Sequence, residues 1–358
     1  MNQTPRNPFS IHSTAVSPPG AQGAPRPVFG SNSVPPLWRS GALWPRLFQV
    51  TSTFSRKRFP TLRGKFQADG EQCLYTESRE FWTEHHKSWR DIMDKLRNID
   101  TFLLDLDGTF YLGDHLYPWS LPFVATCERL GKRFIFVTNN SSRKGDYYVE
   151  KIRKMGVSIT ADQVFTAGQA TIFYLKKYDY PRKIYLVGTP SLEEEFRQAG
   201  FILTEEDPET VVLGFDLTLT YEKLRSACSF IRQGIPFIAT HPDFNCPTPE
   251  GPIPDCGAMI ALITASTGVE PKIIGKPYPE MIEALRAKYG LEDPGKVAMV
   301  GDRLYTDIAM GKAAGITSIL VLSGETKSDD LAASDVQPDV ILDNLGEIAK
   351  ILNQDSLG

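Results

Sequence analysis

From residue 100 onward, short apolar runs alternate with longer stretches of helical periodicity, and this alternation limits the fold more than any other feature of the chain. Such a pattern is typical of βαβ units, in which a helix connects two parallel strands. Strands are expected at 101–106, 133–138, 164–167, 183–188, 211–215, 235–240, 297–301 and 317–322. Helices are expected at 145–155, 169–178, 191–199, 221–233, 279–289 and 306–314. The sequence therefore predicts an α/β protein with a parallel sheet.

Polar residues follow three of these expected strands. Asp105 and Asp107 end the first strand, the segment Thr138-Asn139-Asn140 ends the second, and Asp302 follows the seventh. In open parallel sheets, ligands bind outside the carboxyl ends of the strands. Folding does not require polar side chains from three strands to meet at this edge of the sheet, so their predicted proximity indicates a functional site.

Asp105 and Asp107 are separated by one residue, and Gly108 follows them. In a strand, side chains at i and i+2 point the same way, but a turn at Gly108 can rotate one carboxylate relative to the other. The two can therefore have different roles. Phosphoryl transfer through an aspartate requires two such roles, a nucleophile and a separate acid/base for the leaving oxygen.

The length and the cysteines limit the class of protein. A chain of 358 residues exceeds the usual size of one core, and about two domains are expected. Its five cysteines are scattered without C-x-x-C spacing, which indicates neither a disulfide framework nor a zinc site. We therefore expect a reducing, cytoplasmic setting. No run approaches the roughly 18 to 20 apolar residues that span a bilayer, so no membrane association is expected.

The formal net charge of −4 is unevenly distributed. Residues 1–68 contain nine Arg and Lys but no Asp or Glu, so the rest of the chain carries −13. An acidic body that binds anionic substrates needs local cations and a metal rather than a basic surface. Binding of nucleic acid by the main body is therefore not expected.

Residues 1–92 are expected to form a disordered or non-native extension. Residues 1–68 are rich in Pro, Ser, Gly and Arg, and they lack the apolar content that orders a chain. Residues 71–90 look like a short amphipathic helix, in which His85-His86 is interpreted as solvated surface. Three origins stay open: an organelle transit peptide, a polyanion contact through Arg56-Lys57-Arg58, or an upstream stretch belonging only to the gene model. The last is favoured, with the working protein starting at Met93.

Four motifs occur in order along the body of the chain. They are Asp105-Leu-Asp107-Gly-Thr109, then Thr138 after Phe134–Val137, then Gly275-Lys276-Pro277, and finally Gly301-Asp302 with Asp307. Together they resemble the haloacid dehalogenase-like (HAD) superfamily over residues 100–345. The segments 138–142, 239–243 and 275–277 are similar to those of its class IIA members, the 4-nitrophenylphosphatases and NagD-type phosphatases.

This resemblance implies a Rossmann-like core with an inserted α/β cap of type C2. The core would comprise residues 93–177 and 271–358, and the cap residues 178–270. Cap surfaces often pair subunits in this group, so a homodimer through the cap is one expectation. The chain has His241 where such proteins often have Asn, and Asp255 or Cys256 where they often have a second Gly. These departures leave the substrate preference open.

The resemblance also implies roles for the motif residues. Asp105 would be the nucleophile, and Asp107 would protonate the leaving group and then activate water. Mg²⁺ would be held by Asp105, the backbone carbonyl of Asp107, and Asp302.

Other residues would bind or support the reacting group. Thr138 and Lys276 would bind the phosphoryl group. Asp307 is read as a support or a helix cap. Asn139 and Asn140 are equally consistent with substrate contacts and with turn stabilisation.

Cap residues are harder to assign. Asp243 is the preferred substrate contact, whereas Asp216, His241 and Asn245 are read as turn or packing residues. The segment Glu193–Glu195 is expected to form a solvated helix face, and Cys246 and Cys256 are expected to be ordinary thiols in a Pro- and Gly-rich loop.

The sequence thus predicts a Mg²⁺-dependent phosphatase that acts through an aspartyl phosphate. A cap over the site favours small phosphorylated metabolites over phosphoproteins as partners. The resemblance implies sugar phosphates, phosphoglycolate, nucleoside monophosphates and the artificial 4-nitrophenyl phosphate as candidates. Two alternatives stay open, a phosphotransferase or mutase and a non-catalytic regulatory protein with the same fold.

Overall fold

The computed structural model describes residues 89–354, and its larger sheet contains six parallel strands. The strand order is β15-β14-β13-β1-β4-β5. The bounds are β1 Thr101–Leu104, β4 Arg133–Thr138, β5 Val164–Thr166, β13 Val297–Gly301, β14 Thr317–Val321 and β15 Val340–Leu342. On one side of β1 the sheet continues with β4 and β5, which follow β1 in the chain. On the other side it continues with β13, β14 and β15, so the direction in which successive strands are added reverses at β1. Open α/β sheets bind ligands at such a position.

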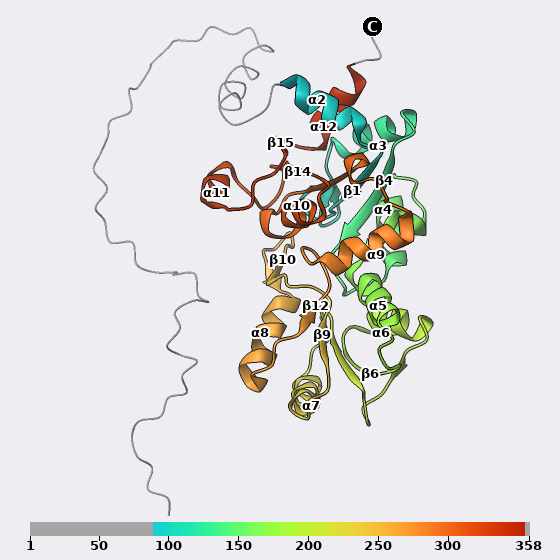
Figure 1. Ribbon diagram of the computed structural model, residues 1–358, viewed down its shortest axis with the longest axis vertical. Helices are drawn as coiled ribbons and strands as arrows, with labels where there is room; N and C mark the ends of the chain where they lie inside the picture. Colours follow the sequence, from blue (N-terminus) through green and yellow to red (C-terminus); the bar gives the residue numbers. More distant parts are fainter. Residues whose placement is uncertain (1–88, 355–358) are drawn as a thin grey trace, which may run out of the picture. The chain divides into compact units, whose positions relative to one another are not determined.

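Helices cover both faces of this sheet (Figure 1). Phe102 and Leu104 of β1 belong to one buried cluster and Leu103 to the other, because successive strand residues point to opposite faces. The first cluster includes residues of α2 (Trp89–Asn98), α3 (Ser120–Arg129), α4 (Gly145–Lys154) and α12 (Leu345–Asn353). The second includes residues of α5 (Ala167–Lys177), α9 (Pro279–Tyr289) and α10 (Ala309–Ala314).

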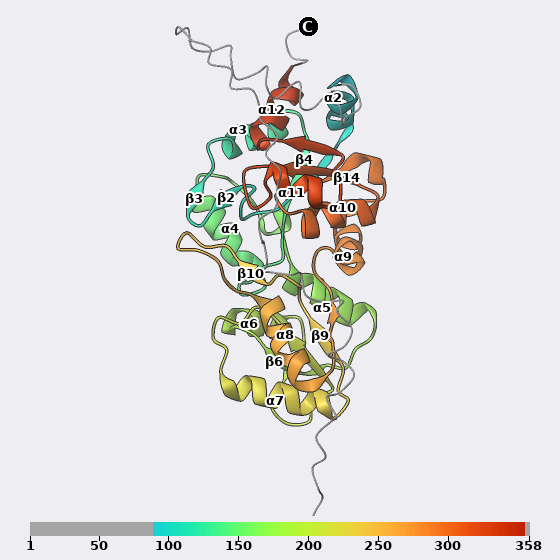
Figure 2. The same cartoon turned by 90° about the vertical axis from the view of Figure 1, so that its left-hand side faces the viewer.

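A second sheet of five parallel strands is inserted between β5 and β13, in the order β12-β9-β8-β6-β7 (Figure 2). Its strands are β6 Lys183–Val187, β7 Ile202–Leu203, β8 Thr210–Leu213, β9 Phe237–Ala239 and β12 Lys272–Ile273. Its helices are α6 Pro190–Gln198, α7 Tyr221–Arg232 and α8 Cys256–Thr267. One face packs on α7 and α8, whereas Ile184 and Leu186 on the other join the cluster that contains Leu103. The two sheets therefore share buried apolar contacts.

Short elements connect these layers. Two antiparallel hairpins are formed by β2 Tyr111–Leu112 with β3 His115–Leu116 and by β10 Asn245–Cys246 with β11 Ile253–Pro254. The remaining elements are the 3-10 helices η2 Ala161–Gln163 and η3 Pro294–Lys296, the π-helix η4 Leu304–Ile308 and helix α11 Ser328–Ala333. The first hairpin follows β1 directly, and the second lies beside Asn140, since Asn140 Nδ2 is 3.8 Å from Cys246 Sγ.

The predicted α/β class with parallel sheets is confirmed, and each expected strand is present with ends within two residues of the prediction. The expected loop position of Cys256 is wrong. Cys256 begins α8, because the Asp255 carboxylate accepts a hydrogen bond from its backbone nitrogen at 2.6 Å. The predicted helix 71–90 and the pair His85-His86 lie almost entirely outside the described residues. Within the described range, no helix is long and apolar enough to cross a membrane.

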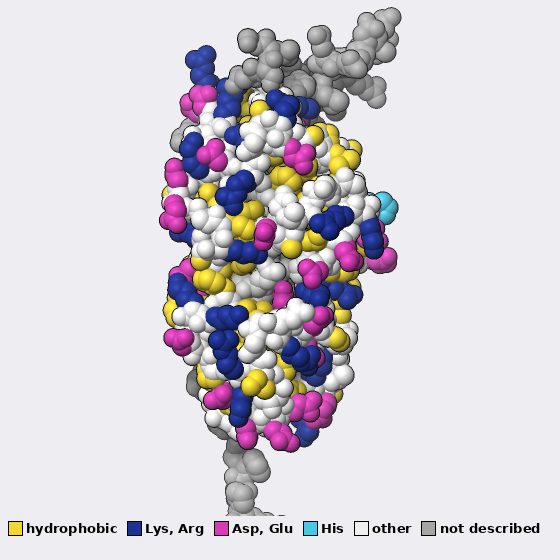
Figure 3. All heavy atoms as spheres, turned by 90° about the vertical axis from the view of Figure 1, so that its right-hand side faces the viewer, with side chains coloured by type: hydrophobic (Ala, Val, Ile, Leu, Met, Phe, Trp, Pro, Cys, Tyr) yellow, Lys and Arg dark blue, Asp and Glu magenta, His cyan; other side chains and the backbone are white. Residues whose placement is uncertain are grey.

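Charged side chains of both signs lie on the face of the described residues that Figure 3 draws. On the face drawn in Figure 3, Lys and Arg are interspersed with Asp and Glu rather than gathered in a single patch. Such mixed charge does not favour the continuous phosphate contacts on which nucleic-acid binding depends.

Candidate active site

The carboxyl ends of β1, β4 and β13 bring the predicted polar residues into one cavity. Its lining includes Asp105 and Asp107 after β1, Thr138 at the end of β4, and Lys276 after β12. Asp302, directly after β13, is not among the lining residues but is buried close by, with a carboxylate oxygen within 4.8 Å of one of Asp105. Parallel strands end at one edge of a sheet, and this geometry collects side chains that are distant in the sequence.

Gly108 lets the loop after β1 approach Asp302. Its φ is +91°, a conformation that glycine adopts at little cost. A Cβ atom at this position would lie only 2.4 Å from Asp302 Oδ2. Glycine is therefore required here both for its backbone conformation and for the space it leaves.

Lys276 carries the positive charge at the centre of the site. Its side chain is 2 % exposed, and Nζ donates hydrogen bonds to Asp105 Oδ1 at 2.5 Å, to Asp307 Oδ1 at 2.7 Å and to the Val137 carbonyl at 3.0 Å. Burial lowers the pKa of Lys276, but the carboxylates of Asp105 and Asp307 raise it more, so its pKa is above the usual value. The lysine is therefore held charged beside Asp105.

Asp107 has a different environment from Asp105. Burial, followed by the nearby Asp105 charge, raises the pKa of Asp107 from 3.8 to about 7. Lys151, Arg303 and Lys276 oppose this shift without cancelling it. A carboxyl group with a pKa near neutrality can both donate and accept a proton during turnover.

Three acidic side chains form a cluster that could hold a cation. Oxygen atoms of Asp105, Asp302 and Asp307 lie within 4.8 Å of one another. Burial, Asp105 and Asp307 raise the pKa of Asp302 to about 8, which shows how strongly the site disfavours a further uncompensated negative charge. A donor set made only of carboxylate oxygens suits Mg²⁺.

The structure places Asp307 inside the π-helix η4 rather than at the start of a regular helix. Its Oδ1 accepts the bond from Lys276, and its Oδ2 accepts one from the backbone nitrogen of Arg303 at 3.3 Å. A Cβ atom on Gly301 would lie 2.2 Å from Asp307 Cγ, so glycine at the end of β13 permits this close approach. Asp307 therefore helps to fix the lysine that contacts Asp105.

The side chains of Asn139 and Asn140 are hydrogen-bonded to other residues of the protein. Asn139 Nδ2 donates to Asp243 Oδ2 and to the Lys276 carbonyl, both at 3.0 Å, and its Oδ1 accepts from the Lys276 nitrogen at 2.8 Å. Asn140 Oδ1 accepts from the backbone and hydroxyl of Ser142. Thr138 Oγ1 accepts from the Asn140 nitrogen at 3.1 Å, a contact that leaves its hydroxyl hydrogen to donate.

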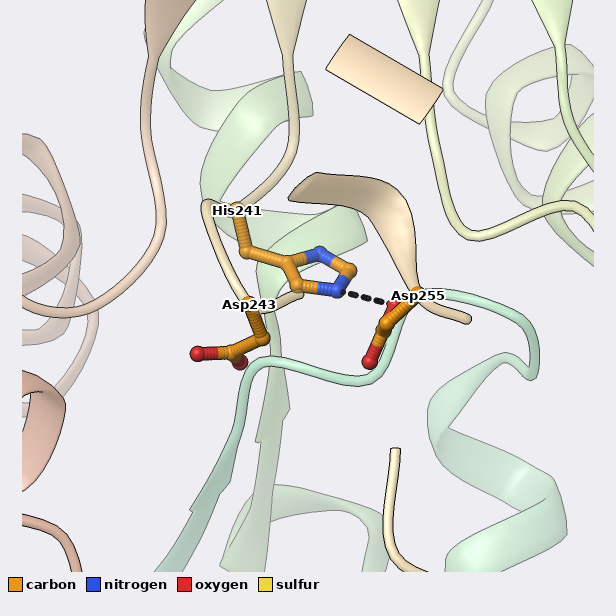
Figure 4. Close-up of side chains that lie close together, drawn as sticks. All are labelled: His241, Asp243 and Asp255. Carbon is orange, nitrogen blue, oxygen red and sulfur yellow. Dashed lines mark hydrogen bonds and ion pairs between the residues drawn. The ribbon is translucent and has the colours of Figure 1, made fainter. Parts of the chain in front are cut away.

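The inserted sheet supplies further residues to the cavity. Its lining also includes Asp243, Asp255, Cys246 and Pro247. Figure 4 shows Asp243 and Asp255 with His241, which is buried and bonded to Asp255. By contrast, Asp216 is paired with Lys223 at 2.6 Å and is not among the cavity's lining residues. Asn245 lies at the exposed end of β10.

Five lining residues were not among the predicted site residues: Cys246, Pro247 and Asp255 of the inserted segment, and Arg303 and Thr306 of the fourth motif. Arg303 follows Asp302 directly, and its Nη1 lies 3.8 Å from Asp243 Oδ2. Thr306 follows within the same motif. Their position in the fourth motif, next to a predicted ligand, is the sequence signal that could have identified both.

Comparison with known proteins identifies the family. Residues 102–202 match the family described as haloacid dehalogenase-like hydrolase, and residues 273–348 match a second HAD-hydrolase-like profile. The chain is 35% identical over 252 residues to the 5'-nucleotidase YutF of Bacillus subtilis, in an alignment that covers 70% of this chain and 98% of that protein. The chain belongs to the haloacid dehalogenase-like hydrolase family.

Other members of the HAD family show the same relationship. An acid sugar phosphatase of Staphylococcus aureus is 34% identical over 70% of this chain and 97% of its own length. The solved structure of a 4-nitrophenylphosphatase from Thermotoga maritima is 50% identical with a TM-score of 0.69, covering 72% of this chain and 98% of that chain. NagD from Escherichia coli is 30% identical with a TM-score of 0.65, covering 70% and 98%. The predicted membership and fold are confirmed.

Proposed function

We propose that this HAD-family hydrolase is a Mg²⁺-dependent phosphatase that hydrolyses a small phosphate monoester through an aspartyl phosphate. The observation that carries this proposal is the contact of Lys276 Nζ with Asp105 Oδ1 at 2.5 Å, in the cavity that Asp107 also lines. The names of the relatives, a nucleotidase, a sugar phosphatase and 4-nitrophenylphosphatases, support the same reaction class.

In the first step, a carboxylate oxygen of Asp105 attacks phosphorus and the bond to the leaving oxygen breaks. Asp107, whose pKa is raised to about 7, gives its proton to that oxygen. In the second step, Asp107 takes a proton from water as the water oxygen attacks phosphorus. The bond to Asp105 then breaks, which releases phosphate and restores both carboxyl groups.

The surrounding side chains stabilise the charge on the phosphoryl group. Lys276 presents a positive charge fixed between two carboxylates, and Thr138 presents a hydroxyl hydrogen. Because these groups are already oriented, they need no reorganisation during the reaction. Asn139 acts mainly by holding the Lys276 backbone, whereas Asn140 orders the loop after β4.

Asp105, Asp302 and the backbone carbonyl of Asp107 are the groups that would hold Mg²⁺. The close-set carboxylates of Asp105 and Asp302 fit this ion, because both are oxygen donors, and because burial and the negative charge around Asp302 raise its pKa to about 8. When bound, the ion offsets the repulsion between Asp105 and the phosphate oxygens.

The inserted sheet would act as a cap. The expected cap bounds of 178–270, within a core of 93–177 and 271–358, leave out β12, which pairs with β9 in this sheet, so we propose that the cap extends to residue 273. The contact of Asn139 with Asp243 joins cap and core at the cavity that Asp105 also lines. Such closure excludes bulk water and limits the substrate to small metabolites. A cytoplasmic location and pairing of two caps in a homodimer are part of the same proposal.

The experiment is a phosphate-release assay with Mg²⁺ over a panel of phosphate monoesters. We expect turnover with at least one sugar phosphate, nucleoside monophosphate, phosphoglycolate or 4-nitrophenyl phosphate. Asp105→Asn should abolish it, whereas Asp100→Asn, at an exposed carboxylate just before β1, should stay within twofold of the wild type. Unchanged release by Asp105→Asn would refute the mechanism, and release that depends on an added alcohol would indicate a phosphotransferase instead.

A further inference from the structure

Asp255 presents a carboxylate to the cavity from the cap side. It lies at the N-cap of α8 and lines the same cavity as Asp105 and Asp107, although its side chain is only 5% exposed. Its Oδ1 accepts from the Cys256 nitrogen at 2.6 Å and lies 2.9 Å from His241 Nε2 (Figure 4). One carboxylate oxygen is thus fixed by two partners, which sets the direction of the other.

His241 connects this carboxylate to the core of the protein. Its Nδ1 lies 2.9 Å from Thr240 Oγ1, which in turn lies 2.9 Å from Ser141 Oγ in the loop after β4. Burial lowers the pKa of His241, but Asp255 and Asp243 raise it more, so its pKa is above the usual value. His241 is fully buried, so it acts on a ligand only through Asp255 and is a positioning residue.

Asp243 adds an acceptor that lacks a donor. Its Oδ2 accepts from Asn139, but its Oδ1 is buried without a hydrogen-bond partner among the described residues. A potential ligand atom from each of His241, Asp243 and Asp255 lies within a span of 4.8 Å. Buried acceptors are almost always paired, so an unpaired one beside the cavity indicates a donor that the ligand brings.

The charges around these residues favour a neutral donor over a cation. Arg303 Nη1 lies 3.8 Å from Asp243 Oδ2, and the imidazole of His241 is already bonded to Asp255. The two carboxylates therefore face two positive or proton-donating groups, which weakens their attraction for a further cation. Carboxylate oxygens only accept hydrogen bonds, so the matching ligand group is a neutral hydrogen-bond donor, and in sugar and polyol phosphates this donor is a hydroxyl.

We infer that Asp255, positioned by His241, and the unpaired oxygen of Asp243 form a subsite that accepts hydrogen bonds from hydroxyl groups of the leaving group. The subsite selects polyol or sugar monophosphates over monoesters whose leaving group carries a carboxylate, because a second anion would face two carboxylates. This inference rests on the proposed phosphatase function and adds its substrate selectivity.

The test compares three substrates with the full-length protein and Mg²⁺: glycerol 1-phosphate, phosphoglycolate and 4-nitrophenyl phosphate. The wild type should show a kcat/KM at least about tenfold higher for glycerol 1-phosphate than for phosphoglycolate. Asp255→Asn should lower kcat/KM for glycerol 1-phosphate by about 10- to 100-fold, while 4-nitrophenyl phosphate, which lacks hydroxyl groups, should change less than about threefold.

Two further variants separate positioning from folding. His241→Gln should raise KM for glycerol 1-phosphate with little change in kcat, and should leave 4-nitrophenyl phosphate nearly unaffected. Asp216→Asn removes a buried cap carboxylate that is not among the cavity's lining residues, and it should lower the three rates equally or not at all.

The outcomes distinguish this inference from the function on which it rests. An equal loss of all three activities in Asp255→Asn, or a wild-type preference for phosphoglycolate, would overturn the subsite and leave the phosphatase intact. Absence of phosphate release by the wild type from every monoester of the panel would overturn the phosphatase, and the subsite with it.

Discussion

Glu195 should make the stability of this protein decrease as the pH rises. The residue lies on α6, where a solvated face was expected, but its Oε2 is enclosed against Gly168 of α5 and has no hydrogen-bond partner among the described residues. Burial raises the pKa of Glu195 from 4.5 to about 7, although hydrogen bonding with Gln169 and Gly145 lowers it. The expected solvated face is therefore wrong for this side chain, because α5 covers it.

The size of the effect follows from proton linkage. The folded protein holds the Glu195 proton to higher pH than the unfolded chain, so this stabilisation is complete below pH 4.5 and is lost as the pH rises through about 7. One pKa unit corresponds to about 1.36 kcal/mol, so this shift corresponds to about 3 kcal/mol. Glu195→Gln has no proton to lose at this position, so it should lack this part of the pH dependence, while other buried carboxyl groups such as Asp107 and Asp302 titrate alike in both proteins.

The assay is urea unfolding of the wild type and Glu195→Gln at pH 5 and pH 8, followed by circular dichroism. The variant should gain about 2.5 kcal/mol relative to the wild type between the two pH values, because a small part of the shift is already lost at pH 5. Glu193→Gln, at a side chain of α6 that is 27% exposed, is the matched control for a surface Glu-to-Gln change. A relative stability of Glu195→Gln that is the same at both pH values would show that burial does not shift this carboxyl group as argued.

Three further predictions concern the site. Lys276→Met leaves the Asp105 carboxylate and its neighbours without their buried cation, so urea unfolding should show that the free energy of unfolding falls by about 3–5 kcal/mol. The phosphate-release assay should show a 10²- to 10³-fold lower kcat. Lys272→Met, at a 43% exposed lysine, is the control. Chelation by EDTA should stop phosphate release and added Mg²⁺ should restore it, whereas activity that survives chelation would contradict a metal at Asp302. Gly108→Ala should lower the melting temperature and activity together, because its Cβ meets Asp302; an unchanged melting temperature would contradict the steric argument.

The sequence predicted the parallel strands well because they are buried on both faces and appear as continuous apolar runs. β1 and β13 are buried along their whole length. Helix α8 was missed for the opposite reason. Its segment Cys256–Thr267 is uniformly small or apolar, has almost no periodicity, and follows a Pro- and Gly-rich loop. Its start depends on a cap by Asp255, which is visible only in the folded chain.

The candidate site could be predicted from the sequence where polar residues lie at the ends of expected strands. Asp105, Thr138 and Asp302 lie where their strands stop, so their proximity follows from the topology of the sheet. The contributions of Arg303 and Asp255 depend on how the inserted sheet packs over that edge, and no local pattern encodes such packing. The catalytic and metal-binding roles remain proposals for the experiments above.

The path of the chain places Lys276 at the exit from the inserted sheet. The lysine follows β12 by three residues, and the residues between them are bonded to the end of β9: the Ile274 nitrogen to the Ala239 carbonyl at 3.1 Å, and the Gly275 nitrogen to the Thr240 carbonyl at 2.7 Å. These two bonds tie the backbone just before Lys276 to the strand end of the smaller sheet, so a rotation of that sheet would move the ammonium group that contacts Asp105. We therefore expect the ¹⁵N resonance of Lys276 Nζ to shift when a phosphate analogue binds.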